Sequence, residues 1–146
     1  MASLTIRIFF LRREVKILAK PSLKLQALKT VLASHGLISL IIGAILLTRA
    51  SSFAKTAGWE RFFDPVMTHV VGAALITFGI GSLIAYLNPS ENAVVIRLEI
   101  IFAFLACVTV LFSLLFRAEL TPSAAWVLAG FNGAFAVLFL ILYPTE

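Results

Sequence analysis

Long runs of apolar residues alternate with short polar segments along this chain. Four runs, at residues 30–48, 66–87, 94–116 and 123–143, each hold roughly the 20 residues that a helix needs to cross a bilayer. Only a helix satisfies its own backbone hydrogen bonds within such a segment. The pattern therefore predicts an all-α polytopic membrane protein with four transmembrane helices.

The segments between the runs predict how these helices are connected. Asp64-Pro65 and Thr121-Pro122 each place a side-chain oxygen before a proline, which is typical of a helix start. Asn88-Pro89-Ser90 and residues 117–122 predict two short turns. Short turns make consecutive helices antiparallel, so we expect residues 30–146 to form an antiparallel four-helix bundle.

Residues 1–29 differ from the rest because bases are interspersed with apolar residues. This pattern predicts an interfacial amphipathic helix on the cytoplasmic membrane surface, and a disordered basic arm is the alternative that composition leaves open. Pro21-Ser22 ends this segment, and Ser22 can cap the helix that follows. The bases expected to contact anionic headgroups are Arg7, Arg12, Arg13, Lys16, Lys20, Lys24 and Lys29.

The basic residues are unequally distributed between the two sides of the predicted bundle. With a cytoplasmic N-terminus, eight of them (the seven above and Arg97) lie on the cytoplasmic side. Because cytoplasmic segments of membrane proteins are enriched in Lys and Arg, this distribution predicts that both termini are cytoplasmic. The remaining four lie on the other side and are Arg49, Lys55, Arg61 and Arg117.

The overall composition excludes several classes of protein. Hydrophobic residues make up 61% of the 146 positions and charged residues 13%, about half of the roughly 25% found in soluble domains. This excludes a soluble enzyme, a disordered linker and a secreted disulfide module, and the single Cys107 excludes an internal disulfide. The net charge of +5 comes with no nucleic-acid-reading motif, so the expected partner is the lipid bilayer and not nucleic acid.

Polar and small residues within the four runs recur at helical spacing. Polar residues are costly in lipid and normally face the interior of a helix bundle. In the second run, a stripe that recurs every four residues is expected to face the other helices; its members are His69, Ala73, Thr77, Gly81 and Ala85. The polar residues expected to pack between helices in the four runs are Ser39, Thr77, Ser113 and Asn132.

His35 and Glu99 form the candidate site. Both lie about five residues, or roughly 8 Å, from the cytoplasmic edge of their runs. A carboxylate at this depth either takes up a proton or finds a cation, and His35 is the expected partner. A structural hydrogen bond, a proton relay and the binding of a polar headgroup all remain open for this intramembrane pair.

No catalytic or cofactor motif is present. HExxH, CxxC, GxSxG and P-loop patterns are absent, and Gly79-Ile80-Gly81 lies inside an apolar run, where it is interpreted as packing glycine. His35 begins the first run on one side and His69 begins the second on the other, too far apart for a bis-histidine haem. We therefore expect no enzymatic activity, no cofactor and no metal, while any small-molecule ligand stays unassigned.

The connector at residues 49–65 predicts a short amphipathic segment in the outer headgroup layer, because it contains Phe53, Trp59, Phe62 and Phe63. Together with Gly36, Gly43 and Gly72, this pattern resembles the small prokaryotic four-helix membrane proteins of the DoxX-like type, over residues of about 30–143. DoxX-like proteins are linked to membrane oxidoreductase complexes as accessory subunits. The resemblance implies a prokaryotic inner (plasma) membrane and other membrane protein subunits as partners, and it carries over no functional residue.

These patterns lead to two hypotheses about function. The first is a non-catalytic accessory or scaffold subunit of a larger membrane complex, with respiratory and photosynthetic complexes among the candidates. The second is a small carrier or channel for protons, lipid or a small solute that uses Glu99, His35 and Asn132. Transporters tend to contain helices interrupted by Gly or Pro, and the absence of a proline inside the four runs counts against the second hypothesis.

Overall fold

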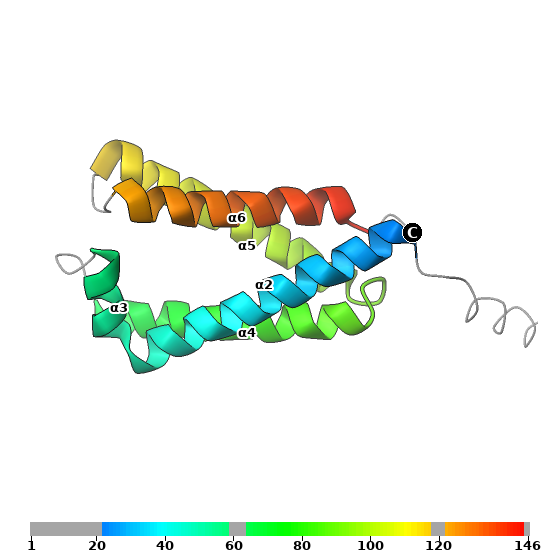
Figure 1. The fold of residues 1–146 in the computed structure, drawn as a ribbon, viewed down its shortest axis with the longest axis horizontal. Coiled ribbons are helices and arrows are strands. Elements are labelled where there is room, and N and C mark those ends of the chain that lie inside the picture. The colour runs from blue at the N-terminus through cyan, green and yellow to red at the C-terminus, as the bar shows by residue number, and fades with distance from the viewer. Residues whose placement is uncertain (1–21, 59–63, 118–121, 145–146) are drawn as a thin grey trace, which may run out of the picture.

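The computed structural model describes residues 22–58, 64–117 and 122–144, and the regular structure within these ranges is all helical (Figure 1). Four long helices account for most of it, and each is long and apolar enough to cross a membrane. The elements are α2 (Leu23–Thr48), α3 (Ala50–Ala57), α4 (Pro65–Leu87), α5 (Ala93–Phe112), the π-helical η2 (Ser113–Arg117) and α6 (Pro122–Leu142).

The prediction of four membrane-length helices is confirmed, and the first of them begins directly after Ser22, its predicted cap. Helix α2 begins at Leu23, so residues 23–29 belong to the same helix as the first apolar run. The early start has a local cause: Ser22 Oγ accepts a hydrogen bond of 3.2 Å from the backbone N–H of Leu25. Such a bond satisfies one of the N–H groups that the first turn of a helix leaves unpaired. The rest of the predicted N-terminal amphipathic helix falls in residues 1–21, outside the described residues.

The start of α4 follows the predicted Asp64-Pro65 signal. Asp64 Oδ1 accepts hydrogen bonds from the N–H groups of Val66 at 2.8 Å and Met67 at 3.2 Å. Pro65 occupies the first helical position, where its missing N–H costs nothing. Helix α6 likewise begins at Pro122, and the predicted cap Thr121 lies outside the described residues.

The connector between α2 and α4 contains the short helix α3, which stands across the end of this pair of helices (Figure 1). Ala50 and Ala54 are buried on one side of α3, and Phe53 is half-buried. Gly58 ends the helix with a φ of 72°, a left-handed conformation that glycine adopts without a steric penalty. The predicted aromatic residues Trp59, Phe62 and Phe63 fall outside the described residues.

Two pairs of glycines hold α2 against α4. Gly36 faces Gly79 and Gly43 faces Gly72, in an order that makes the helices antiparallel. A Cβ atom at Gly43 would lie 2.7 Å from the carbonyl oxygen of Gly72, and one at Gly79 would lie 2.9 Å from that of Gly36. Backbones this close leave no room for a side chain, which is how small residues favour helix association in membranes.

The predicted four-residue stripe is wrong for the first half of α4. His69, Ala73 and Thr77 lie on its exposed face, whereas Gly72 and Gly79 face α2. The reason is geometric, because a seven-residue spacing follows the contact line between two nearly parallel helices more closely than a four-residue spacing does.

Helices α5 and α6 form the second pair, and the two pairs meet mainly at one end of the molecule. Figure 1 shows the α2–α4 pair and the α5–α6 pair drawing apart toward the end that carries α3. We call the opposite end, which carries the turn at residues 88–92, the turn end. A buried cluster joins the two pairs near the turn end; its members are Leu28, Leu32, Ala85, Ile96 and Phe139.

Two cations contact aromatic rings at the turn end. Lys29 Nζ donates to the carbonyl oxygen of Leu87 at 3.5 Å and lies 5.5 Å from the centre of the Tyr86 ring. Arg97 Nε donates to the hydroxyl of Tyr143, with its guanidinium 5.4 Å from the centre of that ring. A cation near the last carbonyl of a helix is stabilised by the helix dipole, so Lys29 ties α2 to the end of α4.

Candidate functional site

Three polar side chains from three helices meet near the turn end. The hydroxyl of Ser82 on α4 donates to Glu99 Oε1 on α5 at 2.6 Å, and Ser82 Oγ lies 3.0 Å from Nδ1 of His35 on α2. Glu99 Oε2 lies 3.4 Å from the same Nδ1. Glu99 and Ser82 are fully buried and His35 is 4% exposed. We call these three residues the polar trio.

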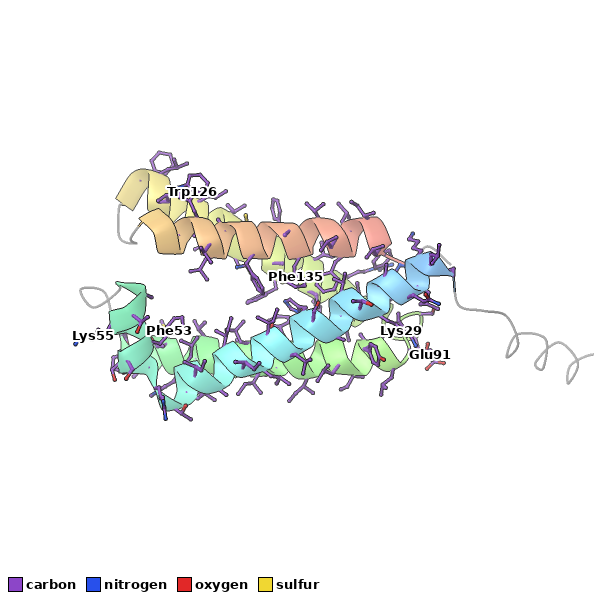
Figure 2. The ribbon with its side chains drawn as sticks, viewed as in Figure 1. Lys29, Phe53, Lys55, Glu91, Trp126 and Phe135 are labelled. Atoms are coloured by element: carbon purple, nitrogen blue, oxygen red, sulfur yellow. The ribbon has the colours of Figure 1, made fainter. Side chains whose placement is uncertain are left out.

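Helix α6 closes the polar trio with aromatic rings. The Phe135 ring centre lies 4.8 Å from that of His35, and the Phe139 ring meets the imidazole edge-on at 5.3 Å. Figure 2 shows Phe135 pointing from α6 toward α2. All four long helices therefore contribute to the surroundings of His35, and the polar atoms of the trio are enclosed by apolar groups.

The local packing explains why these side chains reach one another. The Gly36–Gly79 contact brings the backbones of α2 and α4 together one residue beyond His35 and three residues before Ser82. On the other side, Gly81 lies close to α5, because a Cβ atom there would lie 3.2 Å from Val95 Cγ1 and 4.0 Å from Glu99 Oε1. Small residues on α4 thus let His35 approach Ser82 from α2 and Glu99 approach it from α5.

The hydrogen bonds define the chemistry that the polar trio can perform. Because Ser82 donates its only hydrogen to Glu99, its oxygen is free to accept the N–H of His35 Nδ1. Glu99 Oε2 is buried and has no hydrogen-bond partner among the described residues, although it faces His35. The arrangement suits the holding and transfer of a proton between an imidazole and a carboxyl group.

The geometry differs from that of a hydrolytic Ser-His-acid triad. In such a triad the serine donates to one imidazole nitrogen while the acid accepts from the other. In the polar trio the serine donates to the acid, and both oxygen groups face the same nitrogen, Nδ1. Within the described ranges, no group of three or more His, Cys, Asp or Glu side chains is placed to hold a metal ion.

The structure thus brings together His35 and Glu99, which the sequence analysis paired by their depth. Asn132 is instead bonded within its own helix, where its Nδ2 donates to the carbonyl oxygen of Leu128 at 2.9 Å. Thr77, expected to pack between helices, lies on the exposed face of α4 and donates to Ala73 of its own helix. Ser39 is buried in α2, and Ser113 is half-buried at the start of η2.

The predicted basic surface lies mostly outside the described residues. Of its members, Lys24 is exposed in the first turn of α2, and Lys29 makes the contacts with Tyr86 and Leu87 described above. The other five, which fall in residues 1–21, are Arg7, Arg12, Arg13, Lys16 and Lys20.

Ser82 is the member of the polar trio that the sequence analysis missed. Its signal was available, because Gly72, Gly79 and Ser82 continue one line of small residues at spacings of seven and three. That line is the face of α4 that contacts α2. The predicted four-residue stripe ran along a different line and so passed over Ser82.

The chain has no match among known family models, curated proteins or solved structures. The DoxX-like resemblance therefore stays a prediction based on hydropathy and glycine placement. Any function has to be argued from the helices and the polar trio themselves.

Proposed function

We propose that this chain is a non-catalytic integral membrane protein that serves as an accessory or scaffold subunit of a larger membrane assembly. The observation that carries the proposal is the large share of apolar helix surface that the fold leaves exposed. Only 11% of the residues in the apolar stretch of α5 are buried, against 33% in α2. Outside the helices the described residues form short connections only, so in the described part of the chain the surface available for contacts is that of the helices.

The size of the native particle tests this proposal. After mild solubilisation of native membranes, we expect the chain to migrate in a particle several times larger than its own 15.9 kDa and its detergent. Treatment with a harsher detergent should release the free chain. A chain that migrates alone under the mildest conditions, at its native expression level, would contradict the scaffold role.

We further propose that the four helices cross the membrane as an antiparallel bundle with both termini cytoplasmic, in a prokaryotic inner membrane. The sequence supports this orientation, because eight of its twelve bases fall on the predicted cytoplasmic side and four on the other. Lys55 and Glu91 lie at opposite ends of the molecule, which makes them suitable reporters (Figure 2).

Cysteine labelling tests the orientation. In a Cys107→Ser background, we expect a membrane-impermeant thiol reagent to label Lys55→Cys in intact cells and to label Glu91→Cys only after the membrane is made permeable. Labelling of both positions in intact cells would contradict four crossings, and the reverse pattern would contradict the orientation.

A second candidate function is a small carrier or channel for protons, and the polar trio is the specific observation that favours it. Ionisable residues within membrane helices commonly mark proton or ion pathways. Purified protein in vesicles should then dissipate an imposed pH gradient, and Glu99→Gln should abolish that flux. The participation of Asn132 is the weakest part of this candidate, because its side chain is already bonded to Leu128.

A further inference from the structure

We infer that the polar trio is a proton-binding site that locks the two helix pairs together: one shared proton keeps it neutral and closed, and the gain or loss of a proton opens it. This inference goes beyond the proposed function, because it requires neither a partner subunit nor transport. It rests on where the polar trio lies and on how many protons its two ionisable groups can hold.

The first argument is the position of the polar trio. His35 and Ser82 belong to the α2–α4 pair, whereas Glu99 belongs to the α5–α6 pair. The bond from Ser82 to Glu99 therefore crosses between the pairs, as does the approach of His35 to Glu99. Apolar contacts also join the pairs, such as the stacked rings of Phe78 on α4 and Phe102 on α5, whose centres lie 4.2 Å apart.

The second argument is the charge of each protonation state. With one proton shared between the imidazole and the carboxyl group, the polar trio is neutral overall, whichever group holds the proton. A second proton leaves a net positive charge, and the loss of the shared proton leaves a net negative charge. An uncompensated charge in an apolar interior is strongly unfavourable, and separating the helix pairs lets water reach it.

The described surroundings offer no other ionisable group to neutralise that charge. Among the described residues, His35 is the ionisable group that faces Glu99 from α2, Ser82 is the polar group from α4, and α6 presents Phe135 and Phe139. Arg97, two residues before Glu99 on α5, is exposed and donates to Tyr143. The proton balance of the polar trio therefore depends on His35 and Glu99 alone.

The distance between the two helix pairs, measured as a function of pH, tests the inference. Spin labels at Lys24→Cys on α2 and Leu140→Cys on α6, both exposed, report the separation near the turn end in a Cys107→Ser background. From about pH 4 to about pH 10, which brackets the reference pKa values of Glu and His, we expect a short distance at intermediate pH. A longer distance should be populated at both extremes.

Two variants separate the contributions of the two groups. In Glu99→Gln only the imidazole titrates, so we expect opening at acid pH alone. In His35→Gln only the carboxyl group titrates, so we expect opening at alkaline pH alone. The double variant should stay closed throughout. His69→Gln, which changes the exposed histidine on α4, is the matched control and should behave as the unmodified protein does.

Two results would overturn the inference. One is a distance in the unmodified protein that stays as short at both extremes of pH as it is at intermediate pH. The other is a change at both extremes that persists in the double variant, which would place the titrating groups elsewhere. If the polar trio were only a structural hydrogen bond, the variants would be less stable than the unmodified protein. No variant would then lose the opening at one extreme of pH and keep it at the other.

Discussion

Replacing Glu99 with leucine is expected to lower the free energy of unfolding by about 1–3 kcal/mol, the cost of leaving buried hydrogen-bonding groups without a partner. The loss arises because Ser82 gives up its 2.6 Å bond and His35 loses the carboxyl group 3.4 Å from its Nδ1, while Phe135 and Phe139 offer no polar replacement. Unfolding in mixed detergent micelles, followed by helical signal as the denaturing detergent is increased, measures the difference.

The double replacement of His35 and Glu99 by leucine is expected to regain most of that stability. An apolar pair of similar volume avoids the desolvation that the polar pair incurs, and such exchanges are often neutral or stabilising. Ser82 can then bond a carbonyl oxygen of its own helix, as Thr77 does with Ala73. The loss of stability in the double variant should therefore be much smaller than the sum of the losses in the two single variants.

The matched control is His69→Leu, because His69 lies on the exposed face of α4. Its effect on stability is expected to stay within about 0.5 kcal/mol, as is usual for surface positions. If Glu99→Leu proved as mild as this control, Glu99 would not be held by Ser82 and His35 in the folded protein.

Replacing Gly43 with leucine is expected to separate α2 from α4 and to destabilise the fold by about 3 kcal/mol, the upper end of the usual cost of an overpacked core. A Cβ atom at Gly43 would meet the Gly72 carbonyl oxygen at 2.7 Å and Ile76 Cγ1 at 2.8 Å. The first of these is backbone, so it cannot rotate away. The same unfolding experiment measures the loss, and Gly72→Leu should behave alike.

Gly130→Leu provides the control for hydrophobicity and helix propensity. It makes the same chemical change within a membrane-length helix, but a Cβ atom at Gly130 meets nothing within 4 Å. We therefore expect it to leave the unfolding midpoint nearly unchanged. Equal losses in Gly43→Leu and Gly130→Leu would show that the close approach of α2 and α4 does not contribute to stability.

The hydropathy pattern alone was sufficient to predict the number, type and approximate bounds of the long helices. Helix length in a bilayer is set by thickness, and the Asp64-Pro65 start follows from local hydrogen bonding. The proximity of His35 and Glu99 followed from counting their depth along two helices. These features depend on local sequence or on distance from one membrane edge, both of which can be read without knowing the packing.

The rotation of each helix about its axis was harder to predict. The inward face of α4 is set by where Gly72 and Gly79 meet Gly43 and Gly36 on α2, which is a property of the pair and not of either helix. A regular four-residue template instead selected His69, Ala73 and Thr77, which lie on the exposed face. Ser82 was missed for the same reason, since it lies on the glycine line.

The division into two helix pairs has a consequence for biosynthesis. Both glycine contacts join α2 to α4, so the first pair can pack as soon as residue 87 has left the ribosome, before α5 has emerged from it. At that moment His35 and Ser82 can already bond each other. Glu99 follows on the second hairpin, and the Ser82 hydroxyl that donates to it is by then already in position on α4. The order of synthesis thus helps to set the register in which the late hairpin docks onto the early one.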